Sequence, residues 1–160
     1  MPFADIHNAL PLLQRLPVFG QMTAAITVAP MASAAQFRAS LELAWRNTAA
    51  GWSANEFRFT PIQPQGRGRP RAIDFCNLRD RVGIELELSN QNAVTHDLLK
   101  LETAYGNNLT TCGVLVVPTI ETRDANQWYG YDYYATYEYA EEWLRIYTPS
   151  LRSPIVVWGV

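Results

Sequence analysis

Apolar and polar residues alternate most regularly in the middle of the chain. The alternating residues are Ile84, Glu85, Leu86, Glu87 and Leu88. Because side chains two positions apart lie on the same face of a strand, the pattern predicts a strand over residues 81–89. Its aliphatic side chains face one way and its two glutamates face the other.

A second short strand is predicted just before this one, over residues 72–76, where Asp74 lies between Ile73 and Phe75. Residues 77–80 predict the turn that joins the two strands. If the strands pair, three carboxylates of like charge gather on one small patch. Such a cluster is unfavourable unless a cation neutralises it, so the pattern indicates a metal site.

The rest of the pattern predicts helices and strands in alternation. Helical spacing of apolar residues predicts helices over about 35–48, 93–105 and 137–147. Apolar or alternating runs predict strands over 57–59, 113–118 and 155–158. Residues 22–28 fit a short strand and a helix end equally well. A strand, a helix and a buried strand in succession predict an α/β fold, with a central mixed β-sheet flanked by α-helices.

The length and composition fit one folded domain over residues 1–160, with 48% of the residues apolar. No apolar run reaches the roughly 18–20 residues that span a bilayer, and the first residues lack the basic start and apolar core of a secretion signal. Cys76 and Cys112 lie in apolar contexts and predict buried, unbridged thiols. We therefore expect a cytoplasmic protein without a membrane partner.

Charge is distributed unevenly along the chain. The net charge of −2 and the pI near 5.7 argue against a protein that only coats nucleic acid. However, three arginines interspersed with glycines directly precede Asp74, and they are Arg67, Arg69 and Arg71. They are candidates for phosphate contacts, since glycine lets the backbone approach closely, although a solvated loop is equally compatible. Lys100 is a further candidate for a phosphate contact, with a surface role as the alternative.

The acidic trio suits a hard cation. Mg²⁺ prefers oxygen ligands and typically takes one or two carboxylates together with water. It polarises a phosphoryl oxygen and lowers the pKa of a bound water. The expected ligands are Asp74, Glu85 and the backbone carbonyl of Leu86. Glu87 is expected to orient or deprotonate the attacking water.

The chain has, in order, Asp74, the run Glu85-Leu86-Glu87, a helix and the buried strand at residues 113–118. This order resembles the core of the PD-(D/E)xK nucleases. The resemblance covers about residues 70–120 and is closest to type II restriction endonucleases of the BamHI and BglII kind. Those enzymes often replace the usual lysine with Glu or Gln, and Glu87 fits the Glu version. The helix that contains Lys100 resembles the one after their catalytic strand.

The resemblance implies a restriction-endonuclease-like fold and Mg²⁺-dependent hydrolysis of DNA phosphodiester bonds, leaving 5′-phosphate ends. It also implies a homodimer with one site per strand, one or two ions per site, and Mn²⁺ as a substitute ion.

Two alternatives remain open. The first is a nuclease fold that has lost catalysis and serves as a DNA-binding or assembly module. The second is an unrelated binding protein whose aromatic segment at residues 128–134 takes a sugar or a peptide. In a nuclease the same segment could stack on bases, form a dimer contact or line the core. Glu42, Glu56 and His96 are weaker site candidates, because no local pattern supports them.

Overall fold

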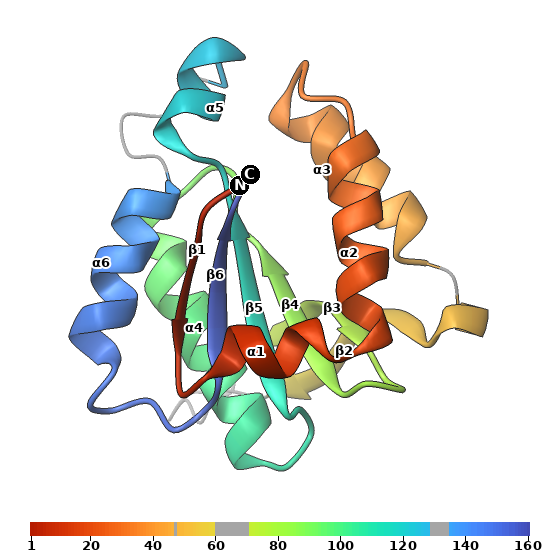
Figure 1. The fold of residues 1–160 in the computed structure, drawn as a ribbon, viewed down its shortest axis with the longest axis vertical. Helices are drawn as coiled ribbons and strands as arrows, with labels where there is room; N and C mark the ends of the chain where they lie inside the picture. The colour runs from red at the N-terminus through yellow and green to blue at the C-terminus, as the bar shows by residue number, and fades with distance from the viewer. Residues whose placement is uncertain (47, 60–70, 129–134) are drawn as a thin grey trace, which may run out of the picture.

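The protein is described here from a computed structural model, which places residues 1–46, 48–59, 71–128 and 135–160. Within these residues one mixed sheet has the strand order β1-β6-β5-β4-β3-β2, and helices cover both of its faces (Figure 1). This confirms the predicted α/β architecture. β4, β5 and β6 run parallel, while β1 is antiparallel to β6, β3 to β4, and β2 to β3.

The strands of the sheet agree well with the sequence pattern. They are β1 (Phe3–Ile6), β2 (Trp52–Phe59), β3 (Arg71–Asn77), β4 (Val82–Leu86), β5 (Cys112–Val117) and β6 (Ile155–Gly159). β2 is longer than expected because it begins at Trp52, and β4 ends three residues earlier than the predicted 81–89 strand. β1 has no counterpart in the prediction, since its four residues are too few to show a period.

The helices are α1 (Ala9–Gln14), α2 (Pro17–Val28), α3 (Ala34–Ala44), α4 (Gln91–Gly106), α5 (Ile120–Ala125) and α6 (Tyr137–Tyr147), with a 3₁₀ turn at Thr48–Ala50. The predicted helices correspond to α3, α4 and α6. The ambiguous residues 22–28 are the second half of α2, which begins with a proline in its first turn, where this residue is favoured. Ser33 caps α3, since its hydroxyl accepts a hydrogen bond from the Gln36 amide at 3.2 Å.

The two faces of the sheet carry separate hydrophobic cores. α1, α2 and α3 pack on one face, and α4 and α6 pack on the other (Figure 1). Ile84, Leu86 and Leu88 all belong to the core beneath α1–α3. Glu85 contacts Lys100 of α4, on the opposite face. The predicted alternation of aliphatic and acidic side chains in this strand is therefore confirmed as far as Glu85.

α4 approaches the sheet closely, because glycine lies beneath it. A Cβ atom on Gly113 of β5 would lie 3.0 Å from the Cβ atom of Leu101, and one on Gly83 of β4 would lie 3.5 Å from a methyl group of the same leucine. Leu101 is fully buried at this contact. The close packing matters for the site, since α4 also carries Asp97 and Lys100.

Trp128, the first residue of the aromatic segment, is a core residue. It is 5% exposed, and its indole N–H donates to the Met31 carbonyl at 2.8 Å. Its ring lies 5.7 Å from that of Phe37. For this residue the structure favours the core-edge interpretation over base stacking, whereas residues 129–134 lie outside the described part of the chain.

Cys76 and Cys112 are buried and form no disulfide, as predicted. Burial, together with the charge of Asp5, raises the pKa of the Cys112 thiol to about 12. Among the placed residues, no helix is both long enough and apolar enough to cross a membrane.

Replacing Trp128 with alanine is expected to lower the free energy of unfolding by about 3–5 kcal/mol, because it removes a buried indole and leaves a cavity. Urea unfolding followed by circular dichroism measures this change. Ile146→Ala, at a side chain that is 55% exposed, is the control and should cost less than about 0.5 kcal/mol. Equal effects of the two substitutions would contradict a core role for Trp128.

Candidate metal-binding and hydrolytic site

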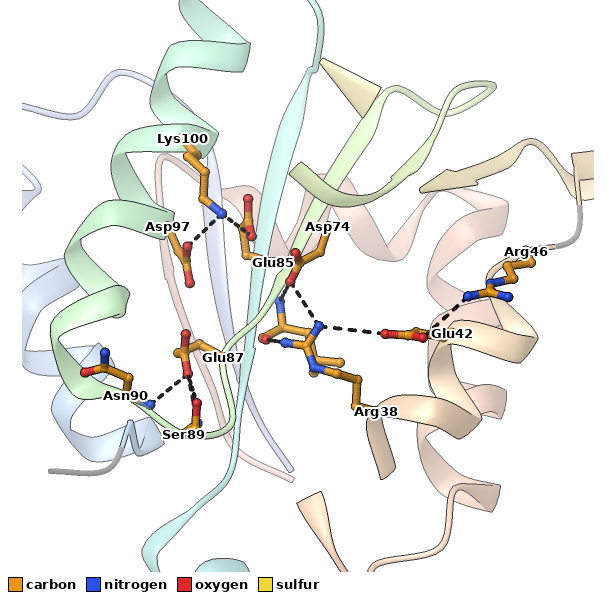
Figure 2. A network of polar contacts seen from close by, with 11 residues as sticks. Arg38, Glu42, Arg46, Asp74, Glu85, Glu87, Ser89, Asn90, Asp97 and Lys100 are labelled. Atoms are coloured by element: carbon orange, nitrogen blue, oxygen red, sulfur yellow. Dashed lines mark hydrogen bonds and ion pairs between the residues drawn. The ribbon is translucent and has the colours of Figure 1, made fainter. Parts of the chain in front are cut away.

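Asp74 and Glu85 lie where β3 and β4 separate. Paired residues of these strands run from Asn77 and Val82 to Phe75 and Ile84. Beyond that point the Asp74 carboxylate accepts a hydrogen bond from the Leu86 amide at 3.1 Å. A hydrogen bond to a side chain thus joins the two strands where their backbone pairing ends. Figure 2 shows Asp74 and Glu85 as neighbours between α4 on one side and α3 on the other.

Glu85 forms a buried ion pair with α4. Its side chain is 1% exposed, and Oε2 lies 2.7 Å from Nζ of Lys100. The same ammonium group lies 2.9 Å from Oδ1 of Asp97, one helical turn away. The other oxygen of Glu85, Oε1, is buried and receives no hydrogen bond from any of the placed residues. One ammonium group is therefore shared by two buried carboxylates and can compensate the charge of only one.

The ionisation of this cluster reflects its excess of negative charge. Burial raises the pKa of Glu85 well above its usual value, and the charges of Asp97 and Asp74 raise it further. Burial also raises the pKa of Asp97 to about 6, against the opposing effect of Lys100. Burial alone would lower the pKa of Lys100, but the charges of Glu85 and Asp97 outweigh it and raise that pKa. A further cation beside these carboxylates would be favourable.

Glu87 is directed toward the loop that precedes α4. Its Oε1 accepts hydrogen bonds from the amides of Ser89 and Asn90, each at 2.8 Å, and from the Ser89 hydroxyl at 3.1 Å (Figure 2). Asn90 is the N-cap of α4. The charge of Glu87 contributes to the raised pKa of Asp97, so Glu87 lies within electrostatic reach of the cluster although its carboxylate serves the loop.

Arg38 reaches the site from α3. Its guanidinium donates a hydrogen bond to the Leu86 carbonyl and lies 3.7 Å from Oδ2 of Asp74. It also lies 3.9 Å from Glu42, which in turn pairs with Arg46 at 3.6 Å. A cavity of about 200 Å³ adjoins these groups, and its lining residues are Arg38, Glu42, Arg46, Ala54, Asp74 and Phe75.

The structure brings together three of the predicted site groups, namely Asp74, Glu85 and the Leu86 backbone. Lys100 also lies there, with its ammonium group engaged by two carboxylates. Glu42, a weak candidate from the sequence, lines the cavity beside Asp74, whereas His96 is exposed on α4. Arg67 and Arg69 lie outside the described residues, and the side chains of Arg71 and Glu56 are not described.

Two residues of the site were not expected from the sequence. Asp97 did leave a signal, since it is an acid between Val94 and Leu101 on the apolar face of α4. Nothing in the sequence pointed to Arg38, because charged residues commonly lie next to buried ones on an amphipathic helix. Its role depends on how α3 packs against the end of β4.

The residues at the fork of β3 and β4 fit a hard divalent cation. Across the placed residues no three His, Cys, Asp or Glu side chains are arranged to hold a metal ion by themselves. Asp74, Glu85 and the Leu86 carbonyl form a smaller, all-oxygen donor set. Such a set suits Mg²⁺, which takes one or two carboxylates and completes its shell with water. The buried Glu85 Oε1, which lacks a donor from the placed residues, is an acceptor at this point.

Asp97→Asn is expected to change how stability depends on pH. The folded-state pKa of Asp97 is raised to about 6 from its ordinary value of 3.8, so the folded protein binds this proton more tightly than the unfolded chain does. That stabilisation is complete below about pH 4 and is lost as the pH rises through 6. The free energy of unfolding of the wild type, relative to Asp97→Asn, should fall by about 2 kcal/mol between pH 4 and 7.

Urea titrations at a series of pH values measure this difference. Glu121→Gln, at an exposed acid in the first turn of α5, is the control and should follow the wild type at every pH. Parallel curves for the wild type and Asp97→Asn would contradict the raised pKa.

Comparison with known families agrees with this fold. The family model described as restriction endonuclease BglII/BglIII matches residues 12–160, which include every strand of the sheet except β1. A search of curated proteins found no match. The matching family consists of type II restriction endonucleases of the PD-(D/E)xK kind, which cleave DNA, and the mixed sheet flanked by helices is consistent with their core. The chain therefore belongs to the BglII/BglIII restriction endonuclease family.

Proposed function

We propose that this protein is a Mg²⁺-dependent DNA endonuclease whose hydrolytic centre lies at the fork of β3 and β4. The observation that carries the proposal is the meeting of Asp74, Glu85 and the Leu86 backbone at one point, in a chain of a restriction endonuclease family. Family membership supports DNA as the substrate. The all-oxygen donor set supports a hard divalent ion, with Mn²⁺ as its substitute.

Asp74, Glu85 and the Leu86 carbonyl are the groups that would hold the ion, and a second ion at the same carboxylates is compatible with the proposal. When bound, Mg²⁺ polarises a phosphoryl oxygen and lowers the pKa of a coordinated water. Lys100 contributes by compensating the charge of Glu85, because a buried carboxylate without a cationic partner would tend to take up a proton. We also retain Lys100 as a candidate contact to the scissile phosphate.

We assign Glu87 the role of general base, which takes the proton of the attacking water. Its three hydrogen bonds to the loop all use Oε1, so Oε2 is the atom that we assign to the water. These bonds also hold the side chain in place just after β4. The water would attack phosphorus opposite the leaving 3′ oxygen, leaving a 5′-phosphate.

DNA is expected to lie across the fork of β3 and β4, beside the cavity that α3 lines. Arg67, Arg69 and Arg71 precede Asp74 in the sequence, and we assign them to phosphate contacts, which position a protein on DNA without reading its sequence. A homodimer that acts once on each strand, in the cytoplasm, completes the proposal.

Plasmid cleavage tests the proposal. The wild type should nick and linearise plasmid in Mg²⁺, and Asp74→Asn and Glu85→Gln should each lower the rate by at least about 100-fold, since each removes a charge from the reaction centre. Chelation should abolish cleavage, and Mn²⁺ should restore it. Glu121→Gln, at an exposed acid of α5, serves as the control and should cleave as the wild type does.

Cleavage by the wild type that does not exceed that by Asp74→Asn would overturn the proposal. Retention of DNA without cleavage would then favour the alternative, a nuclease fold that has lost catalysis. If the protein also fails to retain DNA, both the nuclease and the DNA-binding interpretations are contradicted.

Simultaneous replacement of Arg67, Arg69 and Arg71 with glutamine is expected to weaken DNA binding. If all three contact phosphates, the slope of log K against log salt concentration should become shallower by about 2–3, because fewer counterions are released. Fluorescence anisotropy with a labelled duplex measures this in the Asp74→Asn background, where the DNA stays intact. An unchanged slope would exclude these arginines from the interface.

A further inference from the structure

We propose that Arg38 competes with the divalent cation for the site, and that its guanidinium must leave Asp74 and Leu86 before the ion is bound. The inference rests on the proposed function, because it concerns the same metal site. It adds a residue that lowers the affinity of the protein for the ion.

The guanidinium of Arg38 lies among groups that suit a metal ion. It contacts the carboxylate of Glu42 on α3, the carboxylate of Asp74 on β3 and the backbone carbonyl of Leu86 on β4 (Figure 2). Carboxylate and carbonyl oxygens are the ligands that hard divalent cations prefer. An organic cation therefore occupies an oxygen-lined position formed by three different elements.

The donor set at the fork is divided between two cationic side chains. Lys100 engages Glu85, whereas Arg38 engages Asp74 and the Leu86 carbonyl. A divalent ion bound to the same oxygens would lie beside the guanidinium and be repelled by it. The Leu86 carbonyl would in addition have to share its oxygen between the ion and the N–H of Arg38, which brings the two cations together. Both effects make Arg38 a competitor of the ion.

Of the two cations, Arg38 is the one held less firmly. Lys100 is 18% exposed and lies 2.7 Å from a carboxylate that is itself buried. The side chain of Arg38 is 39% exposed, and its two ion pairs are longer, at 3.7 and 3.9 Å. Exposed pairs of this kind contribute little to stability.

Arg38 also has a place to move to. The cavity of about 200 Å³ beside Asp74 is lined by Arg38 itself and by Glu42. A guanidinium that withdraws from the Leu86 carbonyl and the Asp74 carboxylate into this cavity, which Asp74 and Arg46 also line, can keep its pairing with Glu42. Lys100 offers no comparable route, since both of its partners are buried carboxylates.

Binding of Mn²⁺ to the intact protein in the absence of DNA tests the competition. Titrations followed by the electron paramagnetic resonance of unbound Mn²⁺ would compare the wild type with Arg38→Gln and Arg38→Lys. Arg38→Gln should bind Mn²⁺ about tenfold more tightly, since the loose ion pairs and the hydrogen bond no longer oppose the ion. Arg38→Lys, which keeps the charge but loses the planar fork of donors, should fall between the two.

Arg46→Gln is the matched control. It removes the same charge from the lining of the same cavity, in the turn that follows α3, but Arg46 pairs with Glu42 and not with Asp74. Its affinity for Mn²⁺ should change less than about twofold. Adding Asp74→Asn to Arg38→Gln should cancel the gain, because the tighter binding uses Asp74.

Thermal unfolding gives a second readout that does not depend on catalysis. Saturating Mn²⁺ should raise the unfolding midpoint of Arg38→Gln more than that of the wild type, because a tighter ligand stabilises the folded state more. A purely structural role of Arg38 would lower the midpoint without enlarging the response to Mn²⁺.

The competition is overturned if Arg38→Gln binds Mn²⁺ no more tightly than the wild type, or if Arg46→Gln gives an equal gain. Either result, together with Asp74-dependent Mn²⁺ binding and plasmid cleavage by the wild type, would leave the proposed nuclease intact. Binding that is independent of Asp74 in every variant would overturn the competition and also the metal site on which it rests.

Discussion

The ion pair between Glu85 and Lys100 is the interaction on which the site depends. A carboxylate that is 1% exposed is costly to bury alone, and α4 supplies its cationic partner. Lys100 reaches Glu85 because α4 packs tightly on the sheet, and this packing requires glycine beneath Leu101, at Gly113 in particular. The buried ion pair of the site and the close packing of α4 on this face of the sheet therefore depend on each other.

The parts of the fold that could be predicted are those with dense periodic signals. β4, α4 and β5 each carry an apolar pattern that is long enough to define its period, and the structure has them where expected. α1 and α5 were missed because six residues do not complete two helical turns. α2 was only partly predicted because its composition is mostly apolar, so no polar face stands out.

Within the site, the sequence indicated the acids but not the cations that accompany them. Asp74 and Glu85 could be found because each interrupts an apolar strand. Arg38 meets Leu86 across 48 residues of chain, and such a contact depends on how α3 packs, which no local pattern reports. Glu87 shows the limit of periodicity, since short-range hydrogen bonds to Ser89 and Asn90 compete with the orientation that the strand suggests.

The burial of both cysteines has a practical consequence. A thiol reacts as its thiolate, and Cys112 combines burial with a pKa raised to about 12, while Cys76 is shielded from solvent as well. Maleimide reagents should therefore spare the native thiols of the folded protein. A cysteine introduced at an exposed position of α3, such as Leu43 at 78% exposure, would then accept a single dye or spin label. Such a label would report on the movements of α3 beside the site in solution, without first removing the native cysteines.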